Sequence, residues 1–522
     1  MTPAYCNPAV DEEIFAEADA AYAKLKSALL SDEKREQQEA VLERWLRVEQ
    51  QELMRLLLTS HARLRGQESA VEPVVGADGV QRTHVHEDKT RQVETVFGAV
   101  EVPRTRYAGR GLSGLCPVDG HMNLPAGRHS LEVQRQVAKF AARISFDATV
   151  ETMAEQTGAK VAKRQAEELA RRAAMDFDLF YEWSYFDSGL ETSDLLTLTF
   201  DQKGVVLHRQ DLTEATRKAA ESSKSKLETR TSVGEAKRGR KRMAMVAAVY
   251  TVAPYRRTAQ DVIAGLRRVR QASPKPRPRP EYKRVWASIT NEPKAVVAAA
   301  FDEASARDPE HRKHWLVVVD GDKKLKRWVL AEAQRRGVQV TLVLDFIHAL
   351  EYLWKAGRAF HTDSGAELEA WVLERLEKML QGGISNVVAG MTRMATMRKL
   401  DDKAREPVDK AARYLLKRKD MMRYDKLLAM GAPIASGIIE GACRHLINDR
   451  LDLTGARWRL LSAEAVMRLR SLLASGDFDE YWEFHEQQEA ERNHLSRYAN
   501  SKIPQTQLPG SKPKLKLLQG GC

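Results

Sequence analysis

The sequence predicts an α/β fold class: a mixed, five-stranded β-sheet with an all-α insertion, preceded by a mainly helical region that contains a β-hairpin and a helix-turn-helix. Three short apolar runs predict the sheet, and each is followed directly by an aspartate: residues 195–200, 314–319 and 338–344. Runs without polar alternation are typical of strands that are covered on both faces. The three carboxylates should therefore lie at the edge of a buried sheet. Each aspartate alone also fits an ordinary turn or helix cap.

A β-α-β unit is predicted between His314 and Asp345. Residues 323–336 have helical character, and Gly337 is the kind of residue that closes a helix. The two flanking strands should be parallel, so that Asp320 and Asp345 lie at the same edge of the sheet.

The chain has 522 residues, which suggests three or four domains, and its net charge is +12. Residues 1–70 hold 9 Lys and Arg against 13 Asp and Glu, so the positive charge belongs to the rest of the chain. This distribution indicates a polyanionic partner, of which nucleic acid is the commonest. Charge that only keeps the protein soluble is the alternative.

The four cysteines are far apart and form no Cys-x-x-Cys pair. A reducing, cytoplasmic setting without disulfides or a structural zinc site is therefore expected. The sequence contains no apolar run long enough to cross a membrane and no signal-peptide core.

The region of residues 1–70 is predicted to be helical. Apolar residues recur at helical spacing over residues 8–66, with a break near Ser31, and such a helical pair suits self-association into a homo-oligomer. In the next region, residues 90–128, the period changes to that of strands over residues 92–108. A β-hairpin with a basic second arm is expected there.

Residues 129–190 are predicted to contain a helix-turn-helix. A helix over residues 146–156 is followed by a short turn that contains a glycine, and the next helix opens with Lys163 and Arg164. These two side chains would contact DNA. A plain helical hairpin fits the pattern nearly as well.

The first part of the predicted core covers residues 191–348. After Asp201, residues 202–204 are expected to turn the chain into a second strand at residues 205–208, and residues 243–251 into a third, as an antiparallel meander. Between them lies a basic stretch whose side chains are DNA-binding candidates: Lys237, Arg238, Arg240, Lys241 and Arg242. A basic, proline-rich segment at residues 273–280 would follow a phosphate backbone or act as a spacer. Residues 293–307 predict an amphipathic helix.

Residues 349–430 are predicted to be an all-α insertion with one apolar stripe that belongs to its core: Leu368, Val372, Leu376, Met379 and Leu380. Residues 431–500 would supply the last helices of the core, and residues 501–522 a basic tail. Ser436 is expected to cap a helix on which Glu440 and Arg444 share one face. Glu440 is then either half of an exposed ion pair or an active-site carboxylate facing the sheet.

The order of elements favours the active-site alternative. Three strands, a helix, a fourth strand ending in aspartate, a helix, a fifth strand and a helix bearing a glutamate is the ribonuclease H-like order. In that fold the first and fourth strands are adjacent and parallel, so Asp201 and Asp320 would converge, and Glu440 would complete the cluster.

Five segments make the sequence similar to the insertion-sequence transposases of the ISKra-four family. They are residues 94–104 (ETVFGAVEVPR), 283–288 (KRVWAS), 344–348 (LDFIH), 439–445 (IEGACRH) and 454–458 (TGARW). The resemblance implies a DDE transposase that binds the ends of its element and a target DNA, and that cleaves and joins DNA strands. Asp201, Asp320 and Glu440 match its acidic triad.

The sequence departs from the family pattern in two places. Gln202 follows the first acid where glycine is expected, and Cys116 is alone in a region that often holds more cysteines. The first departure keeps the carboxylate, and the second makes a zinc ribbon doubtful.

Cleavage and joining of a phosphodiester suit two magnesium ions, for which manganese would substitute, because carboxylates are the hard oxygen ligands of such ions. Asp201 would bridge both ions, and Asp320 and Glu440 would complete one each. Asp345 is the rival for the second acid, with His348 as its companion.

Further side chains are candidates to hold phosphates: Lys203, Arg444, Arg450 and Arg457. Trp458 either stacks on a base or packs in the core. A metal-dependent nuclease or resolvase on the same fold and a non-catalytic DNA-binding protein are the alternatives to a transposase.

Overall fold

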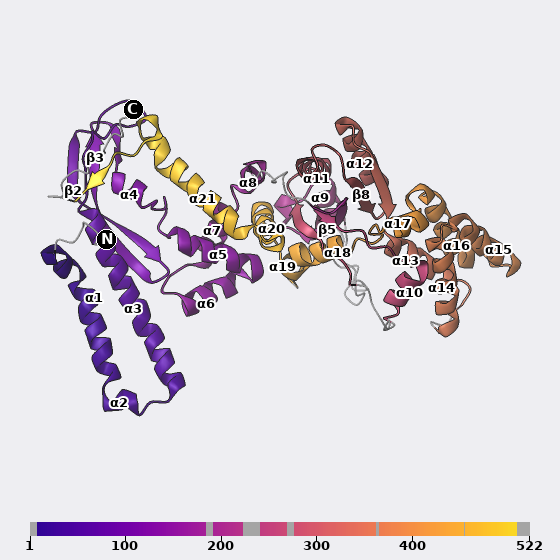
Figure 1. The fold of residues 1–522 in the computed structure, drawn as a ribbon, viewed down its shortest axis with the longest axis horizontal. Helices are drawn as coiled ribbons and strands as arrows, with labels where there is room; N and C mark the ends of the chain where they lie inside the picture. The colour runs from indigo at the N-terminus through magenta and orange to yellow at the C-terminus, as the bar shows by residue number, and fades with distance from the viewer. Residues whose placement is uncertain are drawn as a thin grey trace, which may run out of the picture. The chain divides into compact units, whose positions relative to one another are not determined.

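The computed structural model describes residues 8–183, 192–222, 241–268, 276–361, 365–453 and 455–508 (Figure 1). The chain divides into two compact units, the first made of residues 1–180 and 479–522 and the second of residues 181–478. The prediction grouped residues 431–500 with the core, whereas the part from Asp479 onward belongs to the first unit.

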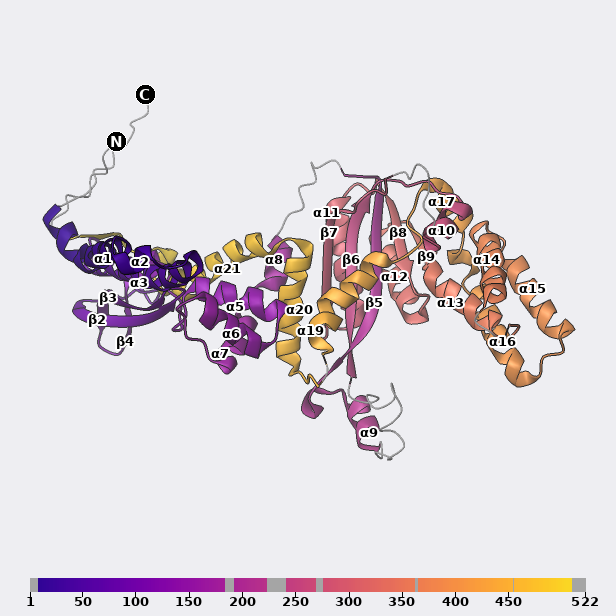
Figure 2. The same ribbon diagram turned by 90° about the horizontal axis from the view of Figure 1, so that it is seen from below.

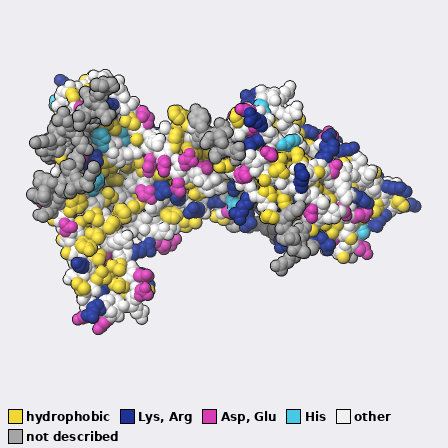
Figure 3. All heavy atoms as spheres, in the orientation of Figure 1, with side chains coloured by type: hydrophobic (Ala, Val, Ile, Leu, Met, Phe, Trp, Pro, Cys, Tyr) yellow, Lys and Arg dark blue, Asp and Glu magenta, His cyan; other side chains and the backbone are white. Residues whose placement is uncertain are grey.

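The first unit begins with a helical hairpin of α1 (Pro8–Leu29), α2 (Asp32–Arg35) and α3 (Glu39–Gly66). Ser31 caps α2 at the predicted break by accepting a hydrogen bond from the Lys34 amide. Large apolar side chains stay exposed on this hairpin, among them Leu30 and Val48, and Figure 3 shows hydrophobic side chains gathered over it.

The predicted β-hairpin is confirmed as β2 (His84–Thr95) and β3 (Gly98–Gly109), and β4 (Leu112–Leu115) extends it to three strands. A short helix, α4 (Pro117–His121), follows. Two residues of the predicted tail form β10 (Thr506–Gln507), which pairs with β1 (Ser69–Ala70).

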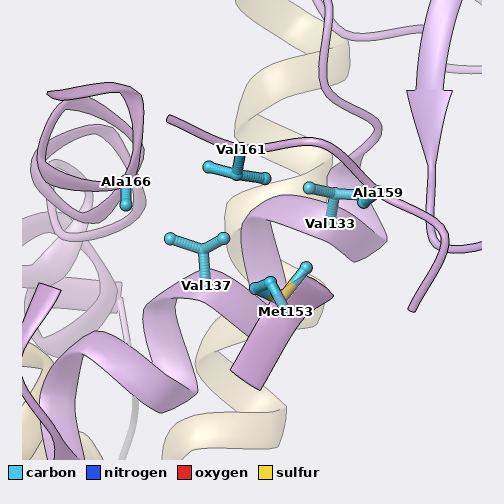
Figure 4. Close-up of a cluster of buried hydrophobic side chains, with 6 residues drawn as sticks. All are labelled: Val133, Val137, Met153, Ala159, Val161 and Ala166. Atoms are coloured by element: carbon cyan, nitrogen blue, oxygen red, sulfur yellow. The ribbon is translucent and has the colours of Figure 1, made fainter. Parts of the chain in front are cut away.

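Three helices pack together in the predicted DNA-binding region: α5 (Leu131–Arg143), α6 (Phe146–Gln156) and α7 (Lys163–Ala173). Their buried side chains point toward one another from all three helices and the linker, and the cluster consists of Val133, Val137, Met153, Ala159, Val161 and Ala166 (Figure 4). The linker is thus fixed by its own apolar residues. The helices α8 (Phe177–Trp183) and α21 (Phe478–Asn493) complete this part of the chain.

The second unit contains the mixed, five-stranded sheet that was predicted. Its strands are β5 (Leu195–Val206), β6 (Lys241–Val252), β7 (Glu281–Ser288), β8 (His314–Val319) and β9 (Val340–Leu344). They lie side by side in the order β7-β6-β5-β8-β9 (Figure 2). The strands β5, β8 and β9 are parallel, while β6 is antiparallel to both β5 and β7. The pairing of the first strand with the fourth is therefore confirmed.

Two predictions about the meander are wrong. Residues 202–204 form no turn, because β5 continues to Val206 and pairs with β6 over its whole length. The third strand is β7, which the sequence did not indicate, because the first half of this edge strand is charged and partly exposed.

The predicted helices over residues 293–307 and 323–336 are confirmed as α11 (Pro293–Arg307) and α12 (Lys323–Arg336). Two further helices, α9 (Glu214–Ser222) and α10 (Ala259–Leu266), were not predicted. Gly337 ends α12 in the left-handed conformation, at a φ of 67°. The described residues contain no helix long and apolar enough to cross a membrane.

Between β9 and α18 the described residues form helices alone, as predicted: α13 (Phe346–Gly357), α14 (Ala366–Leu380), α15 (Ile384–Met397), α16 (Asp402–Leu416) and α17 (Tyr424–Met430). The predicted apolar stripe of α14 is buried throughout. Then follow α18 (Gly437–Cys443), a π-helical segment (Arg444–Asn448), α19 (Asp449–Leu451) and α20 (Leu460–Ser475). Short 3-10 helices lie at Arg209–Asp211, Lys419–Met421, Leu495–Arg497 and Ala499–Ser501.

Candidate active site

Three aspartates lie in one row across three neighbouring strands. Thr199 is opposite Val318 in the parallel pair β5–β8, and Val319 is opposite Leu344 in the pair β8–β9. Continuing each register by one or two residues places Asp201 beside Asp320 and Asp320 beside Asp345. Neighbouring strands are about 4.8 Å apart, so the backbone positions of the three aspartates are close to one another.

Asp201 lies within β5 rather than at its end, and its side chain is 30% exposed. One carboxylate oxygen is 3.2 Å from Nζ of Lys203 and accepts a hydrogen bond from the Cys443 thiol at 3.2 Å. Lys203 is two residues further along the strand and thus on the same face. Burial lowers the pKa of the Lys203 ammonium, but the charge and hydrogen bond of Asp201, together with the charges of Cys443 and Glu440, outweigh this effect, and the net shift is upward.

Asp320 follows the last residue of β8 and is partly exposed. Its Oδ1 accepts a hydrogen bond from the Asp322 amide at 2.8 Å. The backbone of this turn is held by the all-α insertion, because the Tyr414 hydroxyl donates to the Asp320 carbonyl at 2.6 Å and Nε of Arg418 to the Gly321 carbonyl at 2.8 Å. The insertion therefore fixes the position of the second acid.

Asp345, the rival for the second acid, is only 4% exposed, and both of its carboxylate oxygens accept hydrogen bonds. It caps α13 by accepting from the Ile347 amide at 2.8 Å, and it accepts from both the amide and the hydroxyl of Ser436. Ser436 does precede α18 as predicted, but its hydroxyl bonds Asp345 instead of the helix. His348 lies half-buried in the first turn of α13. These contacts give Asp345 a structural role.

Glu440 is exposed on α18, a helix that packs against β5 and β6. Its charge contributes to the raised pKa values of both Lys203 and Cys443, so it lies on the Asp201 side of the helix. The predicted pair with Arg444 is not among the ion pairs of the described residues, in which Arg444 lies 3.6 Å from Asp449. Ile439, Cys443 and Leu446 are buried.

The donor set suits a hard cation, since Asp201, Asp320 and Glu440 all offer carboxylate oxygens. Within the part of the chain that the structure describes, however, no three His, Cys, Asp or Glu side chains are close enough to hold a metal ion. The acids thus share one region without forming a closed ligand set.

The basic candidates of the second unit differ in their placement. Arg450 is buried, its guanidinium 4.6 Å from the Trp458 ring, and burial together with the charge of Arg470 lowers the pKa of Arg450 to about 10. Trp458 is also buried and donates its indole N–H to the Leu451 carbonyl at 3.2 Å, so it packs rather than offering a face to a base. Arg457 is exposed.

The basic stretch before β6 is only partly described. Lys241 lies 3.3 Å from Asp452, and Arg242 is half-buried in β6. Lys237, Arg238 and Arg240 lie outside the described residues.

In the first unit, Lys163 and Arg164 open α7 as predicted and both are exposed. Lys163 is 2.7 Å from Asp147, and Arg164 is 3.3 Å from Glu168.

Sequence reasoning missed Cys443, Tyr414 and Arg418, each of which touches a candidate acid or its turn. The partners in these three contacts are separated in the sequence by 242, 94 and 97 residues, respectively, so no local sequence pattern indicates the contacts. The glycine pattern around Cys443 was noted only as part of a family motif.

No protein-family model matches the sequence, and no curated protein matches it either. The structure resembles that of the Drosophila P element transposase strand transfer complex, with 9% sequence identity, a TM-score of 0.23, and coverage of 71% of this chain and 83% of that chain. A similarity of this size leaves the function to be argued from the site itself.

Proposed function

We propose that this protein is a DDE transposase that cleaves the ends of a DNA element and joins them to a target. The observation that carries the proposal is the row of Asp201 and Asp320 on adjacent parallel strands, with Glu440 on the helix that covers β5. The strand order, with the second strand antiparallel to its neighbours, supports the ribonuclease H-like core that this function would use. The segments shared with the ISKra-four family support the same function.

The three acids would hold divalent magnesium or manganese, for which carboxylate oxygens are the preferred ligands. When bound, two such ions activate the attacking oxygen and stabilise the leaving oxygen of an in-line displacement. Lys203 lies 3.2 Å from Asp201 and would contact the phosphate of a bound strand. The Asp320 turn, held by Tyr414 and Arg418, keeps the second acid in position.

Double-stranded DNA is the proposed partner, because the positive charge of the chain lies outside residues 1–70. We place α7 on the element's ends, and we expect the protein to act as a homo-oligomer in a prokaryotic cytoplasm.

Amide substitutions test the acids one by one. Asp201→Asn, Asp320→Asn and Glu440→Gln should each slow magnesium-dependent DNA cleavage more than about 100-fold, since metal ions supply several kcal/mol of charge stabilisation. Their free energy of unfolding in metal-free buffer should change by less than about 1 kcal/mol, because the ion pair of Asp201 is partly exposed.

Asp345→Asn is the matched control. It should lower the free energy of unfolding by about 1 kcal/mol or more, since Asp345 caps α13. If this variant is stable but inactive while Asp320→Asn still cuts, then Asp345 is the second acid. Products with joined strands indicate a transposase, and products of hydrolysis alone indicate a nuclease.

A further inference from the structure

A cavity of about 440 Å³ lies in the second unit, beside the start of α18. Its walls come from the end of β6 with the loop that follows, from residues 277–280, and from residues 431–438. Apart from small or apolar residues, the lining consists of two tyrosines and three arginines: Tyr250, Tyr255, Arg257, Arg277 and Arg279.

The arginines give the cavity a positive charge that is not fully neutralised. The Arg257 guanidinium lies 5.3 Å from the centre of the Tyr255 ring and donates to the Ala432 carbonyl at 3.0 Å, while its Nε is buried without a partner. Burial and the nearby charge of Arg277 lower the pKa of Arg257. Two like charges on neighbouring walls of the cavity favour an anion between them.

The opposing walls are joined by backbone hydrogen bonds. The Tyr255 amide donates to the Gly431 carbonyl at 2.8 Å, and the Arg257 amide donates to the Leu428 carbonyl at 3.2 Å. Gly431 has a φ of 86°, and a Cβ added to it would lie 2.5 Å from the Tyr255 amide nitrogen. The loop that carries the tyrosine and the arginine is thus held in place before any ligand binds.

The cavity is also connected to the candidate active site. The wall of residues 431–438 continues directly into α18, on which Glu440 lies two residues after Ile438. The same wall bonds Asp345 through Ser436. At the rise of about 1.5 Å per residue of an α-helix, Glu440 lies about 3 Å further along α18 than Ile438, which lines the cavity.

We propose that this cavity binds one unpaired nucleotide of the DNA strand that reacts at Asp201 and Asp320. The proposal rests on the proposed function and adds a subsite to it. The base would stack on the Tyr255 ring or on the Arg257 guanidinium, as unpaired bases do in proteins, and Arg277 and Arg279 would hold the adjoining phosphates. The volume falls within the range of about 300–1,000 Å³ that is usual for small-molecule sites, and a double helix is too wide to enter.

Binding measurements on the full chain test this subsite. In the Asp201→Asn background and without divalent metal, fluorescence anisotropy would compare a blunt duplex with the same duplex carrying a short single-stranded overhang at either end. We expect the overhang to raise affinity about 10-fold, the size of one stacked base. Tyr255→Ala and Arg277→Ala should remove this gain without changing the affinity for the blunt duplex, while Tyr255→Phe should keep it.

Arg256→Ala is the control, because Arg256 is exposed beside Arg257 but does not line the cavity. Equal binding of blunt and overhang duplexes by the parent would overturn the subsite and leave DNA binding intact. Failure to bind either duplex would instead overturn the proposed function. Tight binding of a free nucleoside triphosphate, lost in Tyr255→Ala and without any preference for overhangs, would overturn the assignment to a DNA strand.

Discussion

A buried thiol touches the acid on which the proposed chemistry depends most. Cys443 donates to Asp201 at 3.2 Å from one helical turn beyond Glu440. Burial, followed by the charge of Asp201, raises the pKa of the Cys443 thiol well above its usual range. The sulfur therefore stays protonated and acts as a hydrogen-bond donor that orients the carboxylate, and it should be a poor nucleophile.

Two experiments test the hydrogen bond that Cys443 donates to Asp201 and the low reactivity of its thiol. Cys443→Val should slow cleavage several-fold and raise the magnesium concentration needed for half-maximal rate, because Asp201 loses a donor, whereas Cys443→Ser should restore both. Iodoacetamide at pH 8 should modify Cys443 in the folded protein far more slowly than in the unfolded chain, as mass spectrometry would show. Rapid modification of the folded protein would mean that the thiol is not held as described.

Among the helices and strands, those marked by a pattern of neighbouring residues are predicted best from the sequence. The helix over residues 323–336 is found as predicted, because its apolar period and Gly337 mark both of its ends. In contrast, the polar residues 202–204 resemble a turn, and only the 12-residue pairing with β6 overrides that local preference. The row of Asp201 and Asp320 could be predicted from strand order, but the burial of Arg450 and Trp458 depends on tertiary packing alone.

The helix α7 carries the DNA-binding prediction of its own region. Replacing both Lys163 and Arg164 with alanine should weaken binding to DNA that contains the element's ends. It should also make the plot of log binding constant against log salt concentration less steep, by the amount expected for the loss of about two phosphate contacts. Stability should hardly change, because both side chains form exposed ion pairs that contribute less than about 1 kcal/mol each. Thermal unfolding and a gel-shift salt series would measure the two effects, and an unchanged slope would remove α7 from the interface.

At the scale of the whole molecule, the helical hairpin of α1 and α3 contributes no residue to the candidate active site. Residues 1–70 are acidic while the rest of the chain is basic, which disfavours DNA as the partner of this hairpin. Leu30 and Val48 are 73% and 64% exposed. Exposed apolar side chains that gather on one surface are typical of a protein-protein interface.

Self-association through this hairpin is therefore expected. Light scattering coupled to size-exclusion chromatography should show a larger species for the parent than for Leu30→Glu with Val48→Glu. Circular dichroism should be the same for both proteins, since neither side chain is buried. The exposed substitution Arg44→Glu provides a charge-matched control. Equal masses for parent and double variant would place the oligomer interface elsewhere.

The all-α insertion has a practical consequence for anyone who wants a smaller enzyme. Tyr414 of its helix α16 and Arg418, which follows that helix, bond the turn that carries Asp320. Its last helix is bonded to the loop of Tyr255 and Arg257. Shortening the chain by joining β9 directly to α18 would leave the sheet intact but release both of these loops. The insertion thus holds the turn of Asp320, and a shortened protein made to test the proposed function must keep it.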